Sequence, residues 1–401
     1  MGVFREDFNI NVSTLVKLWV SEGLIKLVKF KSLEDVEEEY LLDLIERNLV
    51  MISEKSSIGK IKACKIHDLL RDLLLSEAEK ERFYLVTSRK LDCLPQGISV
   101  RRLSFDKKLI FSPEILSSSR PRSILIFSGV RSIPSQVLNF RLVRVLHMDK
   151  ARPSNNLVRP VNLRYFSTTM HVHNFGWQAL ESIYKFRNLQ TLHLHDPTSF
   201  IPIWSHFRLA LTPEIWKMTQ LRHVLVEATA NLPDRPCGEN SNVTFPESLK
   251  KLTLVYGNIL WEDMTVVGSL PNFQVLKLKK YAFLGPEWEP NEGEFLQLKF
   301  LLLEEIDLKH WRADSIHFPT LEQLFIKSCE DLEEIPSGIG EITTLQSIKV
   351  YNCRDSLVTS AKEIQETQQS YGNDDLQVRI VPFYNSTGVF SQLSLMCKVI
   401  K

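Results

Sequence analysis

The chain has 401 residues, of which 44% are hydrophobic and 24% charged, and this ordinary globular balance excludes a disordered or fibrous protein. The 49 Lys and Arg residues nearly match the 48 Asp and Glu residues, so no overall field draws the protein to nucleic acid or to an anionic membrane. The six cysteines lie far apart without a C-x-x-C pair, and no apolar stretch approaches the roughly 18 residues that span a bilayer, which predicts a cytoplasmic or nucleocytoplasmic protein without membrane insertion.

The first part of the chain, residues 1–88, carries the signals of a small helical domain. Residues 13–23 predict a helix that begins at Ser13 as its N-cap and ends at Gly23 in a left-handed conformation. A capping-box-like start and an apolar stripe predict a second helix over residues 32–48.

A hairpin and a third helix follow. Residues 49–53 and 60–66 predict the two strands of the hairpin, and Asp68 is the expected N-cap of a helix that carries four leucines. The order helix, helix, hairpin, helix resembles a winged helix. Many winged helices bind DNA, but between Glu34 and Arg47 the expected recognition helix has seven acidic residues and one arginine, which would repel phosphates. We therefore expect no nucleic-acid partner.

From about residue 100 onward, the chain repeats the pattern apolar-x-x-apolar-x-apolar. Eleven units begin 20 to 32 residues apart, close to the spacing of leucine-rich repeats. In a strand, this alternation buries the fourth and sixth positions and turns the third and fifth outward. The units start at Val100, Pro121, Val143, Leu163, Leu189, Leu221, Leu249, Phe273, Leu298, Leu321 and Leu345.

Two cysteines strengthen this register. Cys329 and Cys353 each follow a repeat strand by three residues, where such repeats favour Asn or Cys in the turn, so we interpret them as buried turn residues. The sequence thus predicts an α/β protein in which a small winged-helix domain is followed by a leucine-rich-repeat solenoid, a horseshoe of about eleven parallel strands. The solenoid is expected over residues 89–356, with a C-terminal cap and tail at 357–401.

No catalytic or metal site is expected. The sequence contains no G-x-S-x-G or H-E-x-x-H string and no paired carboxylates in a catalytic context. The pairs His171-x-His173 and His193-x-His195 have a spacing that can chelate a metal, but no nearby carboxylate or cysteine supports them. We interpret these histidines as surface residues of repeat strands.

Several long strings resemble a known family. LVKLWVSEGLI at 15–25, YLLDLIERNLV at 40–50 and IHDLLRD at 66–72 resemble the winged-helix end of plant nucleotide-binding leucine-rich-repeat (NB-ARC) immune receptors, coiled-coil class, late-blight-resistance type. The segment 213–223 is similar to a repeat string of the same class. The resemblance implies a disease-resistance protein of plant defence, N-terminally truncated, whose full-length relatives trigger the hypersensitive response.

The same resemblance suggests a nucleotide sensor. In the family a Met-His-Asp motif contacts bound ADP, and here Ile66, His67 and Asp68 occupy its positions. The family binds ADP or ATP through a G-x-x-x-x-G-K-[ST] loop, and this sequence contains no such string. We therefore expect no cofactor in this chain.

The implied function is non-enzymatic recognition. The resemblance implies a recognition and regulatory module that senses a pathogen effector or a host target through its repeats. The alternatives are a truncated regulatory or decoy fragment that associates with a full-length receptor, and a leucine-rich-repeat scaffold of a ubiquitin ligase, which would need an adaptor helix that the first domain does not resemble.

Two sets of residues are candidates for partner contacts. Basic residues of the early repeats are expected to dock on the nucleotide-binding domain of a receptor, with the acid-rich helix at 34–46 as a local counterpart. The long unit that starts at Leu189 contains aromatic residues suited to an interface. The docking candidates are Arg101, Arg102, Arg122 and Arg144, and the partner-contact candidates are Trp204 and Phe207.

Overall fold

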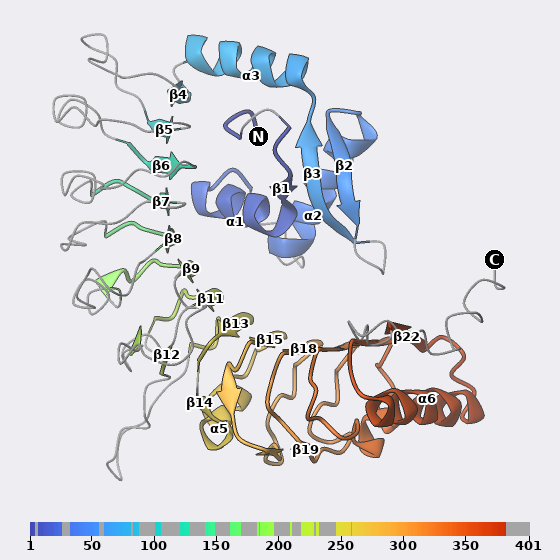
Figure 1. Ribbon diagram of the computed structural model, residues 1–401. Coiled ribbons are helices and arrows are strands. Elements are labelled where there is room, and N and C mark those ends of the chain that lie inside the picture. The colour runs from blue at the N-terminus through green and yellow to red at the C-terminus, as the bar shows by residue number, and fades with distance from the viewer. Residues whose placement is uncertain are drawn as a thin grey trace, which may run out of the picture. The chain divides into compact units, whose positions relative to one another are not determined.

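A computed structural model shows two compact units, residues 1–254 and 255–401, which are described separately (Figure 1). The structure describes residues 1–4, 7–25, 33–55, 60–81, 83–87, 101–105, 121–127, 141–148, 161–169, 183, 185–195, 209–210, 218–227, 230–231, 246–257 and 259–381.

The first unit begins with the predicted order of helix, helix, hairpin and helix. A three-stranded antiparallel sheet in the order β1-β3-β2 lies with the helices, as in a winged helix. The elements are β1 (Ile10–Asn11), α1 (Val12–Glu22), α2 (Leu33–Glu46), β2 (Val50–Lys55), β3 (Ile61–Ile66) and α3 (Asp68–Lys80).

Two predicted helix caps were wrong by one or two residues, while a third was confirmed. The N-cap of α1 is Asn11, not Ser13, because the Asn11 side chain accepts a hydrogen bond from the Thr14 N–H at 3.0 Å. Gly23 ends the helix with φ of 74°, as expected. The N-cap of α3 is His67, because the His67 Nδ1 accepts a hydrogen bond from the Leu69 backbone N–H at 3.3 Å. Asp68 is therefore the first residue of the helix instead of its N-cap.

Every one of the eleven predicted repeat units contains a strand, and successive strands pair in parallel within each unit of the fold. The fourth and sixth positions are buried as predicted: Leu301 and Leu303 are fully buried, and Leu302 between them is partly exposed. In the first unit the strands are β5 (Arg102–Phe105), β6 (Ser123–Ile126), β7 (Val145–Met148), β8 (Tyr165–Thr169), β9 (Thr191–His195), β11 (His223–Glu227) and β13 (Lys251–Val255), and in the second β15 (Val275–Lys279), β18 (Phe300–Glu304), β20 (Gln323–Lys327) and β21 (Ser347–Tyr351).

One further strand precedes the repeat strands and another follows them. β4 (Leu85–Thr87) pairs in parallel with β5, and β22 (Gln377–Val381) pairs in parallel with β21 after helix α6 (Asp355–Ser370). The remaining short elements are β10 (Leu209–Ala210), β12 (Ala230–Asn231), β14 (Ile259–Leu260), η4 (Trp261–Asp263), α5 (Met264–Gly268), β16 (Phe283–Leu284), β17 (Glu287–Trp288), β19 (His310–Trp311) and η5 (Ser337–Glu341).

The second unit has an aromatic interior that the repeat pattern did not predict. The rings of Trp261, Trp288 and Trp311 stack in succession, with centroids 4.8 Å and 5.5 Å apart. They lie on or beside the short parallel pairs β14–β16 and β17–β19, and all three are buried. This stack gives residues 255–381 a core of their own.

The two turn cysteines are buried, as predicted. The Cys329 thiol donates to the backbone carbonyls of Leu303 at 3.6 Å and Lys327 at 3.5 Å, and the Cys353 thiol donates to that of Tyr351 at 3.2 Å. Burial raises the pKa of Cys329 to about 12 and also raises the pKa of Cys353, so both stay protonated turn residues. Among the described residues, no group of three or more His, Cys, Asp or Glu side chains could hold a metal.

In the part of the chain that the structure describes, no helix is both long and apolar enough to span a bilayer.

Candidate functional site

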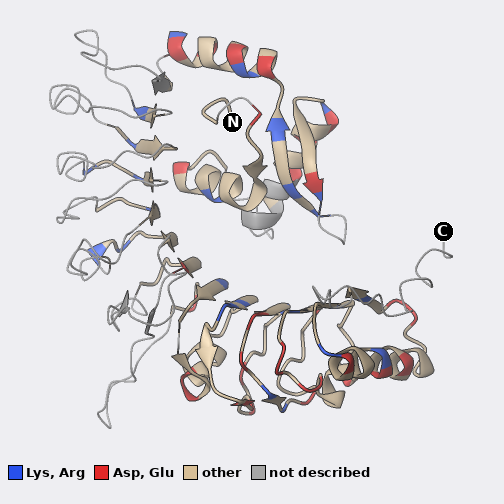
Figure 2. Cartoon of the chain, viewed as in Figure 1, with Lys and Arg blue, Asp and Glu red and all other residues tan. Residues whose placement is uncertain are grey.

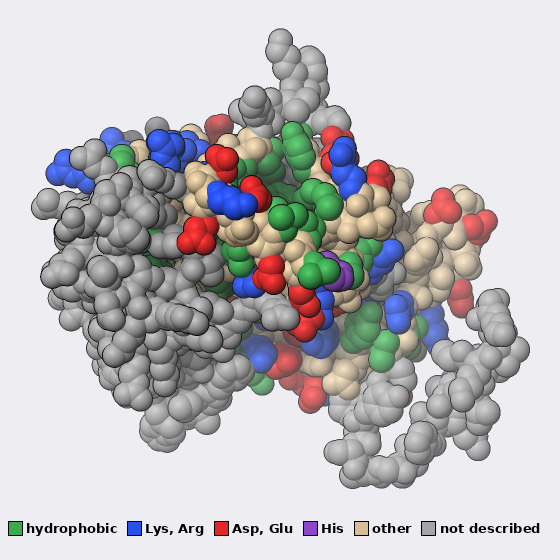
Figure 3. Space-filling view, turned by 90° about the horizontal axis from the view of Figure 1, so that it is seen from above, with side chains coloured by type: hydrophobic (Ala, Val, Ile, Leu, Met, Phe, Trp, Pro, Cys, Tyr) green, Lys and Arg blue, Asp and Glu red, His purple; other side chains and the backbone are tan. Residues whose placement is uncertain are grey.

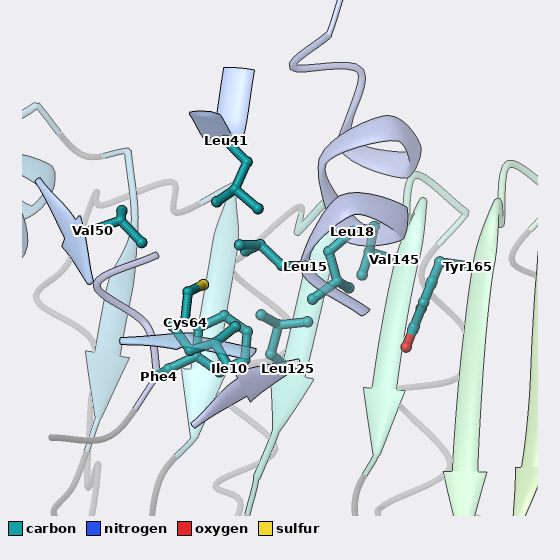
Figure 4. Packing of buried hydrophobic residues seen from close by; sticks show 10 residues of the cluster. All are labelled: Phe4, Ile10, Leu15, Leu18, Leu41, Val50, Cys64, Leu125, Val145 and Tyr165. Atoms are coloured by element: carbon teal, nitrogen blue, oxygen red, sulfur yellow. The ribbon is translucent and has the colours of Figure 1, made fainter. Parts of the chain in front are cut away.

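Helix α1 lies against the inner face of the early repeat strands (Figure 4). Leu15 and Leu18 of α1 belong to one buried cluster with Leu125, Val145 and Tyr165 of strands β6, β7 and β8. These three strand residues occupy third and fifth positions of their repeats, which the sequence pattern predicted to face outward from the core. A helix covers these three positions, which accounts for their apolar side chains.

The C-terminal end of α1 carries a buried ion pair with the same strands. The Arg102 Nε donates to the Glu22 carboxylate at 2.9 Å, and the two side chains are only 13% and 11% exposed. The Ser123 hydroxyl also donates to this carboxylate. Burial raises the pKa of Glu22, and the positive charges of Arg102, Arg144 and Arg122 oppose that shift without cancelling it. The pair therefore positions α1 more than it stabilises it.

The structure brings three of the four predicted docking residues together. Arg102, Arg122 and Arg144, from three consecutive repeats, all act on Glu22, whereas Arg101 is exposed. Among the described side chains, the acidic counterpart of these arginines is Glu22 at the end of α1. Sequence reasoning missed Glu22 because a single glutamate before the Gly23 cap has no distinguishing pattern.

A second polar contact joins the middle of α1 to the repeats. The Lys17 Nζ lies 3.4 Å from the His193 Nε2, and the His147 Nδ1 lies 3.3 Å from the Tyr165 hydroxyl. Burial lowers the pKa of His147 to about 4. Burial, followed by the charges of Lys17 and His147, lowers the pKa of His193 well below its usual range. Both rings are therefore neutral near pH 7.

This contact corrects one interpretation from the sequence. His193 is a partly buried residue under α1 rather than an exposed surface residue, because the fifth position of this repeat faces the helix. His195, two residues on, is exposed and contacts the Glu227 carboxylate of the next strand. His171 and His173, like the predicted contact residues Trp204 and Phe207, lie outside the described residues.

The predicted nucleotide sensor lies at the junction of β3 and α3. Ile66 is buried at the end of the strand, whereas His67 and Asp68 are exposed. The Nδ1 of His67 accepts the capping hydrogen bond of α3, so the histidine has a structural role in this chain.

Helix α3 presents an apolar face that the chain leaves exposed. None of its residues is buried, and Leu69 and Leu73, one turn apart, are 78% and 56% exposed. Apolar side chains gather on the face that Figure 3 shows, the side on which α3 lies in Figure 1. Nearby, a cavity of about 480 Å³ is lined by apolar residues of α1, α3 and the early strands, with Glu22 and Arg102 among its walls. An exposed apolar face of this kind is typical of an interaction surface.

Comparison with known proteins gives this geometry a family context. The family described as "Disease resistance protein Winged helix domain" matches residues 3–74. The chain is 30% identical to a putative late blight resistance protein homolog of Solanum demissum, over 98% of this chain and 37% of that protein. It is 27% identical to a late blight resistance protein of the same species, over 95% of this chain and 36% of that protein. The chain thus spans little more than a third of the length of these relatives.

A leucine-rich-repeat protein of known structure was also matched. This protein, from Leptospira interrogans, aligns with 76% of this chain and 98% of its own, at 13% sequence identity and a TM-score of 0.28.

Proposed function

We propose, because this chain belongs to the plant disease resistance proteins of the late blight type, that it acts as a non-enzymatic recognition and regulatory module of an immune receptor. The repeats would sense a pathogen effector or a host target through protein contacts. The winged helix would couple that contact to the rest of a receptor, and the defence output would be the hypersensitive response. The homology to the late blight resistance proteins supports the disease-resistance role.

One observation carries the regulatory part of the proposal. The buried Glu22–Arg102 pair, set in the apolar contact between α1 and strands β6–β8, joins the winged helix to the inner face of the early repeats. A partner that bends or pulls the repeats would therefore act directly on the winged helix. In a receptor, the arginines of the early repeats would dock on the nucleotide-binding domain. The winged helix would be the part of that domain that lies next to the repeats.

The exposed leucines of α3 favour a second candidate function. A fragment that associates with a full-length receptor, as a regulator or decoy, needs a surface that the receptor can cover. Leu69 and Leu73 offer such a surface on the winged helix itself.

The coupling is tested by charge reversal in the full chain. We expect Arg102→Glu to expose α1 to amide hydrogen exchange, because two carboxylates would then face each other in a buried site. The double variant Glu22→Arg with Arg102→Glu should restore part of the protection. Arg101→Glu is the matched control, since this neighbouring arginine is exposed. Unchanged protection of α1 in Arg102→Glu would contradict the proposal.

The recognition role and the location are tested in leaf cells. Proximity labelling of the tagged chain should identify a protein contact that appears on infection, and microscopy of a fluorescent fusion should place the chain in the cytoplasm or in cytoplasm and nucleus. A set of labelled proteins that is the same with and without the pathogen would contradict effector or host-target sensing.

A further inference from the structure

The inner face of the second unit has a different chemistry from that of the first. Its five strands, β15, β18, β20, β21 and β22, pair in parallel and in register, so that the third, fifth and seventh positions of each repeat form one surface, here termed the 275–381 face. Its members are Val275, Lys277, Lys279, Phe300, Leu302, Glu304, Gln323, Phe325, Lys327, Ser347, Lys349, Tyr351, Gln377, Arg379 and Val381.

Positive charge dominates this face. It holds five basic residues against one acidic residue, Glu304. The Glu304 carboxylate bonds the Lys279 ammonium at 2.8 Å and also the Lys327 ammonium. Although burial raises the pKa of Glu304, the hydrogen bonds and charges of these two lysines outweigh it and lower the pKa, so Glu304 stays ionised between them. Figure 2 marks the charges along these strands.

Two aromatic rings form the centre of the face. The Phe300 and Phe325 rings, on neighbouring strands, have centroids 5.1 Å apart, and both side chains are partly exposed. The Lys277 ammonium lies 5.1 Å from the Phe300 ring centroid, and the Lys349 ammonium lies 4.6 Å from that of Phe325. Lys349 is itself buried, so on the exposed part of the face the rings are bordered by Lys277 and Lys327.

We propose that the 275–381 face binds an acidic polypeptide segment of a partner protein that carries an aromatic side chain. The ring of the segment would pack on Phe300 and Phe325, and its carboxylates would meet Lys277 on one side and Lys327 on the other. This inference rests on the proposed function, since it specifies what the repeats recognise.

A peptide suits this face better than a polyphosphate or a nucleic acid does. Strong phosphate sites use guanidinium forks or free backbone amides, whereas the amides of these strands are paired with each other and the face has one arginine, Arg379. The Glu304 carboxylate in the midst of the lysines would repel a continuous row of phosphates. A peptide can place its separate acids on either side of this carboxylate.

The test uses the full chain and a phage library of short random peptides. We expect the selected peptides to carry Asp or Glu on both sides of an aromatic residue, and fluorescence anisotropy of a synthetic consensus peptide to show saturable binding that weakens with salt. Lys277→Glu combined with Lys327→Glu should weaken that binding at least about tenfold, and Phe325→Ala about fivefold. Lys309→Glu is the matched control, because Lys309 is as exposed as Lys327 (49% and 51%) but pairs with Glu333 away from the face.

Three outcomes would overturn the inference: selected peptides that lack acidic residues, binding that the double lysine variant leaves unchanged, or displacement of the peptide by tripolyphosphate or single-stranded DNA at lower concentration than by free peptide. Circular dichroism and the unimpaired binding of the Lys309→Glu control separate a loss of binding from a loss of folding. Failure of the proposed function is distinguishable, because it would appear as unchanged α1 protection in Arg102→Glu whatever the library selects.

Discussion

The inner faces of the two units are built on the same strand register but have different surfaces. In the first unit the third and fifth positions include Leu125, Val145 and Tyr165, which are buried under α1. In the second unit the same positions include Lys277 and Phe325, which keep part of their surface exposed. The fourth and sixth positions are buried in both units and, apart from Thr168, are apolar. The buried fourth and sixth positions thus determine the solenoid, while the third and fifth positions, on the inner face, reflect what lies opposite them.

The charges of the two faces differ in the same way. Glu22 is 11% exposed, and its ionisation is opposed by burial even with three arginines near it. Glu304 is also buried, 9% exposed, but its lysine partners are 34% and 51% exposed and keep their ammonium groups in contact with water. A pair that is buried on both sides is costly to break, whereas a pair whose cations stay in contact with water costs less to break and can exchange partners.

The largest expected effect comes from placing a fourth cation at the end of α1. Glu22→Arg should lower the free energy of unfolding of the first unit by about 3–5 kcal/mol, because a buried charge would then face Arg102, Arg122 and Arg144 without compensation. Urea unfolding followed by amide exchange in each unit measures this effect. The second unit should keep its protection.

Two further variants separate the effect of charge from the effect of shape, one at this position and one at an exposed pair. Glu22→Gln keeps the shape of the side chain but leaves Arg102 without its counter-charge in a buried site, so it should cost about 1–3 kcal/mol, less than Glu22→Arg. Glu54→Arg, in an exposed pair with Lys62 at 3.5 Å, should cost less than about 1 kcal/mol. If Glu22→Gln were as damaging as Glu22→Arg, the added positive charge would not be the cause of the loss in Glu22→Arg.

The next effect is a dependence on pH that only the first unit should show. The pKa of His147 falls from near 6.5 to about 4 on folding, so the stability it contributes is present above pH 6.5 and is lost as the pH falls toward 4. Between pH 7 and pH 5 this residue alone should cost about 2 kcal/mol. The lowered pKa of His193, which faces Lys17, adds in the same direction, whereas the raised pKa of Glu22 acts in the opposite one.

Amide exchange of strands β6–β8, corrected for the intrinsic effect of pH, measures this loss. His147→Phe keeps an aromatic ring beside Tyr165 and should remove about 2 kcal/mol of the pH dependence. Strands β18–β21 are the internal comparison. Equal losses in both sets of strands would show that the histidines under α1 are not the cause.

The sequence predicted what depends on periodicity and missed what depends on contact. All eleven repeat strands, the two turn cysteines and the winged-helix order were correct, because alternation and spacing are local properties of the chain. Asn11 and His67 were missed as caps because a cap depends on the local backbone conformation. The true caps lie one or two residues before the predicted ones. The burial of His193 could not be predicted, since it depends on a helix more than 170 residues earlier in the chain.

A smaller effect is expected at the lysine-bounded carboxylate of the second unit. Glu304→Gln should lower the free energy of unfolding by about 1–2 kcal/mol, the value of hydrogen bonds to a charged group, because Lys279 and Lys327 remain in contact with water. Chemical denaturation resolved by tryptophan fluorescence measures it. Glu322→Gln, in the more exposed pair with Lys299 at 2.8 Å, is the control and should cost less than about 1 kcal/mol. A loss as large as that in Glu22→Arg would mean that the two faces do not differ as described.

The smallest effect on folding, but not on association, is expected at the apolar face of α3. Leu69 and Leu73 are mostly exposed, so Leu69→Ser and Leu73→Ser should change the free energy of unfolding by less than about 0.5 kcal/mol each. Buried Leu18 of α1, replaced by Ser, is the contrast, because it packs into the cluster under the early repeats. If the α3 face is an interaction surface, sedimentation velocity should show self-association of the unaltered chain that the double α3 variant abolishes. A double variant that unfolds as readily as Leu18→Ser would instead show that these leucines belong to the core of the first unit.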